Sequence, residues 1–553
     1  MQAAPLGSRA VGAATVPIGK GGRFRASQSR PAGLCARAPA TAAARRNGLD
    51  TPRPARGLAP ARAVRADQAA SVDASDVQLI ADVTQAADAR LAAALAAASA
   101  AAAAAAPAPD TALRQRLTAT ITKVQKGLLE RETEVRLMLL AALCGEHLLL
   151  LGPPGTAKSE LSRRLSGVMG GAYFERLLTR FSVPEELFGP LSMKGLENDE
   201  YVRQTAGYLP TAEVAFVDEI FKANSAILNS LLTLLNERLF DNGNLRLSAP
   251  LMCLVGASNE LPESEELDAL YDRFLIRRSV AQVSNAAIAR LARLAAGRDS
   301  GEAGEANGNG NGNGAAAEGL AFKDFKEVAE AAYASVDIPD SVVDVLVELR
   351  NWLQDKCEPP IYVSDRRFMK SVQMLQVIAF ADGRSEANEY DALLLEHVFG
   401  SRPDDATKVR ARVLDIISSD PGLQQTELVF LGLFGRACRL LETPPSAADA
   451  AEAAAEAATL VELLEARQAE LAATLEGQFP ELRATVWQSE ASVQAAVQSL
   501  TPQMTENRRR AEELLREAYV LAECLQRRCS AGVLEKLLPK RYKQYSKGIS
   551  GKA

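Results

Sequence analysis

The chain has 553 residues, of which 47% are apolar, and its formal net charge is −6. This length predicts more than one domain, and the composition is that of a globular protein. No apolar run reaches the roughly 18 residues that a membrane-spanning helix needs, so we expect no transmembrane segment. Seven scattered cysteines without a CxxC pair favour a reducing compartment, and the presence of only two histidines argues against a zinc site.

Residues 1–66 differ sharply from the rest of the chain. They contain 12 basic residues and a single acidic one, Asp50, in a background of Ala, Ser, Pro and Gly. Because they lack the apolar core of a secretory signal, we expect a disordered transit peptide for the chloroplast stroma. A mitochondrial presequence and an untargeted disordered terminus are the alternatives. The remaining chain has 51 basic and 68 acidic residues, so we expect no nucleic-acid binding.

Residues 67–112 form an Ala-rich stretch that ends in Pro107-Ala108-Pro109-Asp110. Its almost pure Ala run should be helical but offers little side-chain surface for packing, so we expect a linker. From residue 113 onward, apolar residues recur at helical spacing and predict a helix before the first strand. We place an α/β core over residues 113–296.

The first strand of this core is predicted at the apolar run 148–151, and a helix at residues 160–169. Between them lies the segment Gly152-Pro153-Pro154-Gly155-Thr156-Ala157-Lys158-Ser159. Backbone N–H groups of such a loop surround a polyphosphate, and the helix N-terminus adds positive potential. Lys158 is expected to reach the β- and γ-phosphates of ATP, and Ser159 to bind Mg²⁺. Ala157 replaces a glycine of the strict pattern, and we expect it to adopt a helical φ.

Residues 189–205 alternate between apolar and polar on either side of a polar turn at 197–200, which predicts an inserted hairpin. This hairpin either takes part in substrate binding or is a surface hairpin without such a role.

A second strand is predicted at residues 213–217, where an apolar run ends in two carboxylates. Asp218 is placed to hold Mg²⁺, and Glu219 is placed to polarise an attacking water. The alternative is a solvated strand end, but both segments in this order are seldom found by chance.

The third strand is predicted at residues 251–257, followed by Asn259. Ligands of open α/β sheets bind at the carboxyl ends of the strands, so Asn259 could orient the lytic water or contact the γ-phosphate. Arg273 lies 14 residues further on, where a finger reaching the phosphate of a neighbouring subunit is expected.

The rest of the chain is predicted to be mainly helical. Repeated Asn-Gly pairs indicate a flexible loop at 297–319, and helical periodicity marks residues 320–403. Residues 404–535 are expected to form a bundle of long helices that Pro480 and Pro502 interrupt. Residues 536–553 form a basic tail, which is either solvated or in contact with an acidic partner or a membrane surface.

These segments resemble AAA+ ATPases of the MoxR family, and within it the RavA branch. The resemblance covers about residues 113–403, and residues 228–238, 255–261, 272–274 and 363–367 also carry it. It implies an AAA+ P-loop core with a parallel sheet, followed by a helical lid. It also implies Mg²⁺-dependent ATP hydrolysis, with Glu219, Asn259 and Arg273 as catalytic residues. The sensor-2 arginine falls on Arg366, which the lid should place over the nucleotide, with Arg367 a close second.

Because Arg273 would act on a neighbour, we expect a homo-oligomeric ring, a hexamer. The resemblance implies chaperone-like remodeling of protein substrates, together with a partner that carries a von Willebrand factor A domain. The β domain of bacterial RavA has no counterpart in this sequence. Two other functions stay open: the motor subunit of a magnesium chelatase, and a nucleotide-gated scaffold without turnover.

Overall fold

The computed structural model describes residues 74–103, 111–262, 264–296, 319–400, 402–442 and 447–550. The predicted transit peptide at 1–66 lies outside these ranges, as does the predicted loop at 297–319 except for its last residue. Within the described ranges, none of the helices combines the length and the hydropathy that crossing a bilayer requires.

A five-stranded parallel sheet forms the centre of the α/β core, with the strand order β2-β3-β6-β1-β7. The strands are β1 (Leu148–Leu151), β2 (Tyr173–Leu177), β3 (Val214–Asp218), β6 (Cys253–Ser258) and β7 (Ile276–Ser279). Successive side chains of a strand point to opposite faces of the sheet. Leu148 and Leu150 therefore enter one hydrophobic cluster, whereas Leu149 and Leu151 enter another. Burial on both faces explains the unbroken apolar run of β1.

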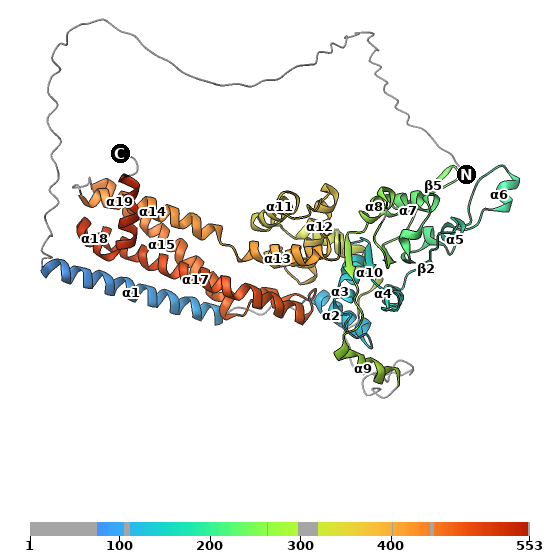
Figure 1. Cartoon of the computed structure of the whole chain (residues 1–553), viewed down its shortest axis with the longest axis horizontal. Helices are drawn as coiled ribbons and strands as arrows, with labels where there is room; N and C mark the ends of the chain where they lie inside the picture. Colours follow the sequence, from blue (N-terminus) through green and yellow to red (C-terminus); the bar gives the residue numbers. More distant parts are fainter. Residues whose placement is uncertain are drawn as a thin grey trace, which may run out of the picture. The chain divides into compact units, whose positions relative to one another are not determined.

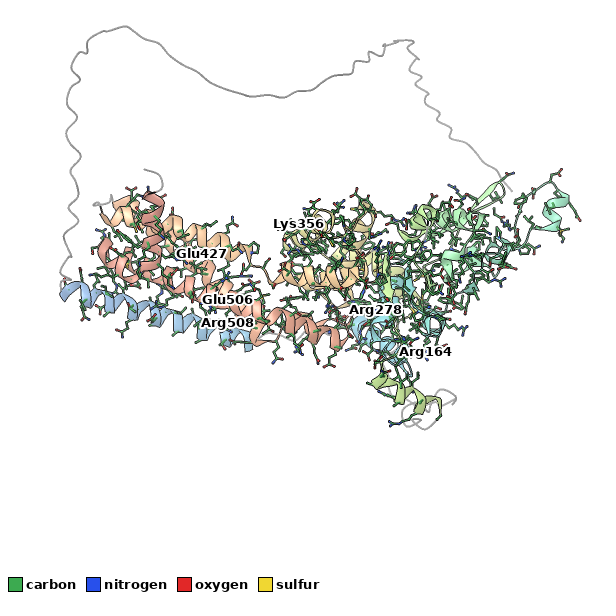
Figure 2. The ribbon with its side chains drawn as sticks, viewed as in Figure 1. Arg164, Arg278, Lys356, Glu427, Glu506 and Arg508 are labelled. Carbon is green, nitrogen blue, oxygen red and sulfur yellow. The ribbon has the colours of Figure 1, made fainter. Side chains whose placement is uncertain are left out.

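Helices cover both faces of the sheet (Figure 1). One face packs against α2 (Ala112–Gln125), α3 (Glu132–Leu143) and α4 (Lys158–Met169), and the other against α7 (Ser225–Glu237) and α8 (Glu265–Tyr271). Arg164, labelled in Figure 2, ties α4 to the end of α2, because its guanidinium donates to the carbonyls of Val124 at 2.7 Å and Lys126 at 2.6 Å. After β7, helix α9 (Asn285–Ala295) is largely exposed.

The predicted inserted hairpin between β2 and β3 is formed only in part, because residues 189–205 contain a single isolated antiparallel bridge in place of two strands. Leu191 pairs with Arg203 in an antiparallel bridge, and the chain between them forms the short helix α6 (Met193–Glu197). A second hairpin, β4 (Leu239–Asn242) and β5 (Leu245–Ser248), follows α7. The Asn242 side chain exchanges two hydrogen bonds with the backbone of Arg203, at 2.6 and 3.1 Å, and so joins the two hairpins. Short helical turns complete this region: α5 (Glu185–Phe188), η1 (Leu209–Thr211) and η2 (Ile220–Lys222).

A helical lid follows the core, as predicted. It consists of α10 (Phe322–Ser335), α11 (Asp340–Asp355), α12 (Asp365–Ala381), η3 (Glu389–His397) and α13 (Asp405–Ser418). Ser364 caps α12, because its hydroxyl accepts from the N–H of Arg367 at 3.3 Å. The apolar positions of α11 that recur at helical spacing are buried in the interior of the lid.

Long helices form the C-terminal bundle, which confirms this part of the predicted fold class. They are α14 (Pro421–Glu442), α15 (Ala447–Glu476), α16 (Pro480–Ala484), α17 (Glu490–Gln526), α18 (Ala531–Leu537) and α19 (Pro539–Ser550). Pro480 begins α16, as its missing N–H allows, but Pro502 lies inside a continuous α17. The prediction of an interruption at Pro502 is wrong. One lost backbone hydrogen bond does not end a helix whose buried face runs on through Leu500 and Met504.

Two segments that the sequence did not predict to pack on the C-terminal bundle do so in the structure. Helix α1 (Ala74–Ala103) lies along α15 and α17 (Figure 1), so the predicted linker is wrong for these residues. Its small side chains let the helices approach closely, and Val83 and Ala87 are fully buried. In the predicted basic tail, Arg541 pairs with Glu427 at 2.6 Å and with Glu517 at 2.7 Å, so this part is docked on the bundle.

Candidate active site

The carboxyl ends of β1, β3 and β6 bring the predicted phosphate-binding and catalytic residues to one edge of the sheet. The N–H of Gly152, directly after β1, donates to the carbonyl of Ser258 at the end of β6 at 3.0 Å. Asn259 follows Ser258 and is exposed. Asp218 ends β3, which pairs with β6. We call this edge, with residues 152–159, Asp218, Glu219 and Asn259, the phosphate edge.

The loop before α4 has the backbone of an anion cradle. Gly152 has φ +154°, and a Cβ there would lie only 2.3 Å from the carbonyl oxygen of Val280, so the position has no room for a side chain. Ala157 adopts φ 66° and ψ 23°, the left-handed region, as the residue that precedes α4. The predicted helical φ for Ala157 is therefore wrong. An alanine in this region costs about 1 kcal/mol, which the surrounding structure must supply.

Lys158 is buried at the phosphate edge. Its Nζ donates to the carbonyls of Gly152 at 2.6 Å and Pro153 at 3.1 Å. Burial lowers the pKa of Lys158, and the nearby charges of Asp218 and Glu219 oppose that shift. The ammonium is thus held by carbonyls of the same loop that would surround a phosphate, and a phosphate oxygen would compete with them for it.

The donor set fits a nucleotide with Mg²⁺. Ser159 lies in the first turn of α4, and Asp218 ends β3, so a hydroxyl and a carboxylate, both hard oxygen donors, lie at the same edge. Glu219 adopts φ 53° and ψ 43°, a second left-handed residue at this edge. Its N–H donates to Oδ1 of Asp218 at 3.0 Å, and its Oε2 lies 3.3 Å from Nζ of Lys222.

Arg131 is a residue of this site that the sequence did not reveal. It is buried just before α3, where its Nε donates to the carbonyl of Thr156 at 3.2 Å and its Nη2 to the carbonyl of Ala281 at 2.7 Å. It therefore braces the phosphate loop against the segment after β7. No local pattern marks Arg131, because its partners lie 25 and 150 residues away in the chain.

The predicted arginines lie at the opposite edge of the sheet. Arg273 precedes β7, and Glu146 precedes β1, so both lie at the amino ends of these parallel strands. Lys370 of α12 pairs with Glu146 at 2.8 Å, which brings the start of α12 to the same place. Burial and then the charge of Arg273 lower the pKa of Arg366, whereas Glu146 and Asp272 oppose the shift. We call this edge, with Arg273 and Arg366, the arginine edge.

This arrangement corrects one expectation. The lid does not place Arg366 over the phosphate loop of its own chain, because α12 crosses the amino ends of β1 and β7. Six residue-to-residue steps of extended chain lead from Glu146 to Gly152, a span of about 20 Å. No single side chain covers that distance, so Arg273 and Arg366 are remote from the phosphate edge of their own chain.

The structure also distinguishes Arg366 from Arg367. Arg367 is buried, and its Nη2 pairs with Oδ1 of Asp272 at 2.7 Å. Arg366 is half-buried, and its Nη1 has no hydrogen-bond partner within the described residues. Of the two, Arg366 is the one whose guanidinium is not already committed to an ion pair within the lid and core.

Comparison with known proteins gives consistent matches. Residues 115–310 match a family model described as the MoxR domain in the MoxR-vWA-beta-propeller ternary systems, and residues 341–413 match an AAA lid domain. An uncharacterized protein of Methanocaldococcus jannaschii is 40% identical over 305 residues, which cover 54% of this chain and 75% of that protein. Chaperone MoxR1 of Mycobacterium tuberculosis is 28% identical over 169 residues, 30% of this chain and 44% of the relative.

A solved structure from Cytophaga hutchinsonii matches with a TM-score of 0.43 and 16% sequence identity, over 55% of this chain and 94% of that one, which is too weak to support an argument. The match to the MoxR domain spans the parallel sheet with its phosphate edge, and the match to the AAA lid domain spans most of the helical lid. The chain belongs to the MoxR family of AAA+ ATPases.

Proposed function

We propose that this protein hydrolyses ATP, with Mg²⁺, at a site that two copies of the chain share. The observation that carries the proposal is the separation of the phosphate edge from the arginine edge by the chain from Glu146 to Gly152, which spans about 20 Å and includes β1. A chain that keeps its nucleotide-binding loop and its arginines this far apart has a complete site only where its arginine edge meets the phosphate edge of a neighbour. A repeated head-to-tail contact of this kind forms a ring where the rotation between successive copies closes, and we propose a hexamer.

The chain's own residues divide the chemistry between them. The backbone of residues 152–157 and the ammonium of Lys158 bind the polyphosphate. Glu219 accepts a proton from the attacking water, and Asn259 orients that water from the neighbouring strand end. Ser159 and Asp218 would hold Mg²⁺, which neutralises negative charge on the phosphates. Arg273 and Arg366 of the adjoining copy stabilise the charge that develops in the transition state.

The first prediction concerns the shared site. Arg273→Ala should bind nucleotide like the parent but lose most of its turnover, because an arginine finger typically contributes ~10³–10⁵ in rate. Lys158→Ala should fail to bind nucleotide. An equimolar mixture of the two should regain about a quarter of the parent rate, since random assembly joins an intact loop to an intact arginine at that share of the interfaces.

Phosphate release and binding of a fluorescent ATP analogue measure both effects. An assembled mixture as inactive as its two components would refute the shared site. Equal turnover of Arg273→Ala and the parent would also refute it.

The second prediction concerns the base. Glu219→Gln should retain ATP through gel filtration and stabilise the assembly, with hydrolysis reduced by about 10²–10⁴-fold. Glu260→Gln, which removes an exposed carboxylate at the same edge, is the matched control and should hydrolyse ATP like the parent. Fast hydrolysis by Glu219→Gln would assign the base to another residue.

We further propose that hydrolysis drives chaperone-like remodeling of protein complexes. Two observations support this: the relative from Mycobacterium tuberculosis is named a chaperone, and the matched family model is described from MoxR-vWA-beta-propeller systems. A protein with a von Willebrand factor A domain is therefore the proposed partner. Membership of the RavA branch and targeting to the chloroplast belong to the same proposal.

Capture of proteins on the Glu219→Gln variant from a plastid extract would test the remodeling role, with Lys158→Ala as the nucleotide-free control. Metal insertion into a porphyrin together with chelatase subunits would favour the chelatase alternative. ATP binding without phosphate release by the assembled parent would favour the scaffold.

A further inference from the structure

The turn that carries Arg273 is held by two buried arginines, Arg277 and Arg367, that take no part in the chemistry proposed above. The turn comprises Tyr271 to Phe274, between the end of α8 and the start of β7. Arg277 contacts it from β7, and Arg367 contacts it from the lid helix α12. Both arginines are at least nine-tenths buried. Neither can therefore reach a phosphate on a neighbouring copy as the structure stands.

Arg277 donates hydrogen bonds to the backbone of the turn on both sides of Arg273. Its Nη2 donates to the carbonyl of Tyr271 at 3.0 Å, and its Nε donates to the carbonyl of Phe274 at 3.1 Å. Its guanidinium also lies over the ring of Tyr271, 3.8 Å from the ring centroid. A rigid planar fork with two carbonyl acceptors and an aromatic face fixes the position of a turn more strictly than a single contact does.

The same two arginines connect the turn to the lid. The Nη1 of Arg277 donates to the carbonyl of Gly400 at 3.1 Å, at the end of the segment that follows η3. Asp272 accepts from Nη2 of Arg367 at 2.7 Å and from the hydroxyl of Ser364, the capping residue of α12, at 3.3 Å. Arg273 itself lies 3.8 Å from Asp272, Nη1 to Oδ2. The lid therefore reaches the residue directly beside the finger through an ion pair and a hydrogen bond.

Because Arg277 and Arg367 are buried, losing these contacts would cost free energy. A buried charge that loses its partner leaves the other charge without compensation, which is costly in a medium of low dielectric constant. Burial and the neighbouring charge of Arg367 lower the pKa of Arg277 to about 9, whereas Asp272 opposes this shift. Asp272 is the carboxylate that pairs with Arg367, so displacing the turn would leave Arg367 without its counter-charge and would remove the carbonyls of Tyr271 and Phe274 from Arg277.

We propose that Arg277 and Arg367 are positioning residues, which hold Arg273 at the neighbour's nucleotide and make its position depend on the position of the lid. This inference rests on the proposed function, because it assigns the finger to a site in trans. The lid of one copy would then set the hydrolysis rate at the site of the next copy. Its own phosphate edge would keep its affinity for nucleotide.

The test uses Arg367→Met in the full-length chain, mixed with each of the two variants described above. Alone, it should lower kcat at least tenfold, with nucleotide binding unchanged. Mixed with Lys158→Ala, which donates an intact finger, it should regain turnover, because its own phosphate loop is intact. Mixed with Arg273→Ala it should regain none, because neither chain supplies a positioned finger.

A merely structural defect would not produce this asymmetry. Recovery in both mixtures would overturn the proposal, because the finger of Arg367→Met would then still work. Recovery in neither would also overturn it, because the variant would have lost its own nucleotide site. Asp272→Asn, a milder change, should give the same asymmetry with a smaller loss.

The matched control is Arg350→Met. Arg350 also pairs with a carboxylate at the start of α12, Asp365 at 2.5 Å, but does not contact the turn. It should behave like the parent in both mixtures. If the parent itself, or the mixture of Arg273→Ala with Lys158→Ala, released no phosphate, the proposed function would fail first. If instead the parent and that mixture are active, and Arg367→Met recovers in both of its mixtures or in neither, the further inference alone fails.

Discussion

Individual residues at the phosphate edge are held in conformations that their side chains disfavour. Ala157 of the loop and Glu219 of the carboxylate pair both have positive φ, at 66° and 53°. A left-handed residue other than glycine costs about 1–3 kcal/mol and persists only where the surroundings enforce it. The contacts that hold Ala157 in this conformation include the hydrogen bond from Nε of Arg131 to the carbonyl of the preceding residue, Thr156. The loop thus keeps its shape through tertiary contacts, in place of the freedom that a glycine would supply.

The third prediction follows at this scale. Ala157→Gly should raise the free energy of unfolding by up to about 1 kcal/mol, because glycine adopts the left-handed region without a steric penalty. Nucleotide affinity should stay within about twofold of the parent. Urea unfolding and binding of a fluorescent ATP analogue are the measurements. Ala142→Gly, a buried helical position of α3, is the contrasting control and should destabilise the protein. Destabilisation by Ala157→Gly would show that the φ of this residue is not strained.

At the scale of elements, the docking of α1 decides the extent of the C-terminal bundle. The helix comes before the α/β core in the chain, yet it packs on α15 and α17, which come after the lid. Asp88 pairs with Arg516 at 2.8 Å, and the guanidinium of Arg90 lies 4.5 Å from the ring centroid of Tyr519. The first described helix therefore completes a bundle whose other helices are encoded more than 300 residues later.

The fourth prediction tests this docking with two substitutions on one helix. Val83→Asp should lower the free energy of unfolding of the bundle by about 2–4 kcal/mol, because it places a carboxylate at a fully buried position. Val77→Asp makes the same chemical change at a position that is 57% exposed, and should change stability by less than about 0.5 kcal/mol. Circular dichroism in urea measures both. Equal stability of the two variants would mean that α1 is not docked in solution.

For the whole molecule, the dependence of stability on pH is set in part by the two histidines of the chain. Burial lowers the pKa of both His147 and His397 well below the ordinary value near 6.5. Nearby guanidinium groups act in the same direction, Arg238 on His147 and Arg278 on His397. Below about pH 6.5 the unfolded chain therefore binds protons that the folded chain does not, and the folded state is progressively destabilised.

The fifth prediction gives this effect a sign and a size. The contribution of the two neutral histidines is fully present by about pH 8, well above the unfolded-state pKa near 6.5, and about 1.5 kcal/mol of it should be lost as the pH falls from about 8 to about 6. Asp382, whose pKa burial raises to about 6, acts in the opposite sense at lower pH, because the folded state then binds the extra proton.

His147→Asn should halve the histidine-dependent loss. The asparagine carbonyl oxygen can still accept the N–H of Leu254, which Nδ1 of His147 accepts at 3.0 Å in the parent. Asp382 is common to both proteins, so its effect cancels in the comparison. Urea unfolding at several pH values gives the two slopes, and identical slopes would exclude His147 as a contributor.

The sequence by itself determined the parts of the protein whose signals are local. A strand, a loop and a helix follow one another within 22 residues at 148–169, and carboxylates directly follow a second apolar run. Parallel strands align their carboxyl ends, so the meeting of Lys158, Asp218 and Asn259 at one edge could be predicted before the fold was known. Helical periodicity likewise identified the lid and the C-terminal bundle.

Only the tertiary structure decided the features that depend on how distant elements pack. A spacing pattern states which face of a helix is apolar, but it does not state which partner covers that face. The pattern therefore could not place α12 at the arginine edge, dock α1 on α15, or bring Arg131 to the phosphate loop. The φ of Ala157 belongs to the same group, because packing overrides the local preference of the residue. These long-range contacts also determine which copy's nucleotide lies within reach of Arg273 and Arg366.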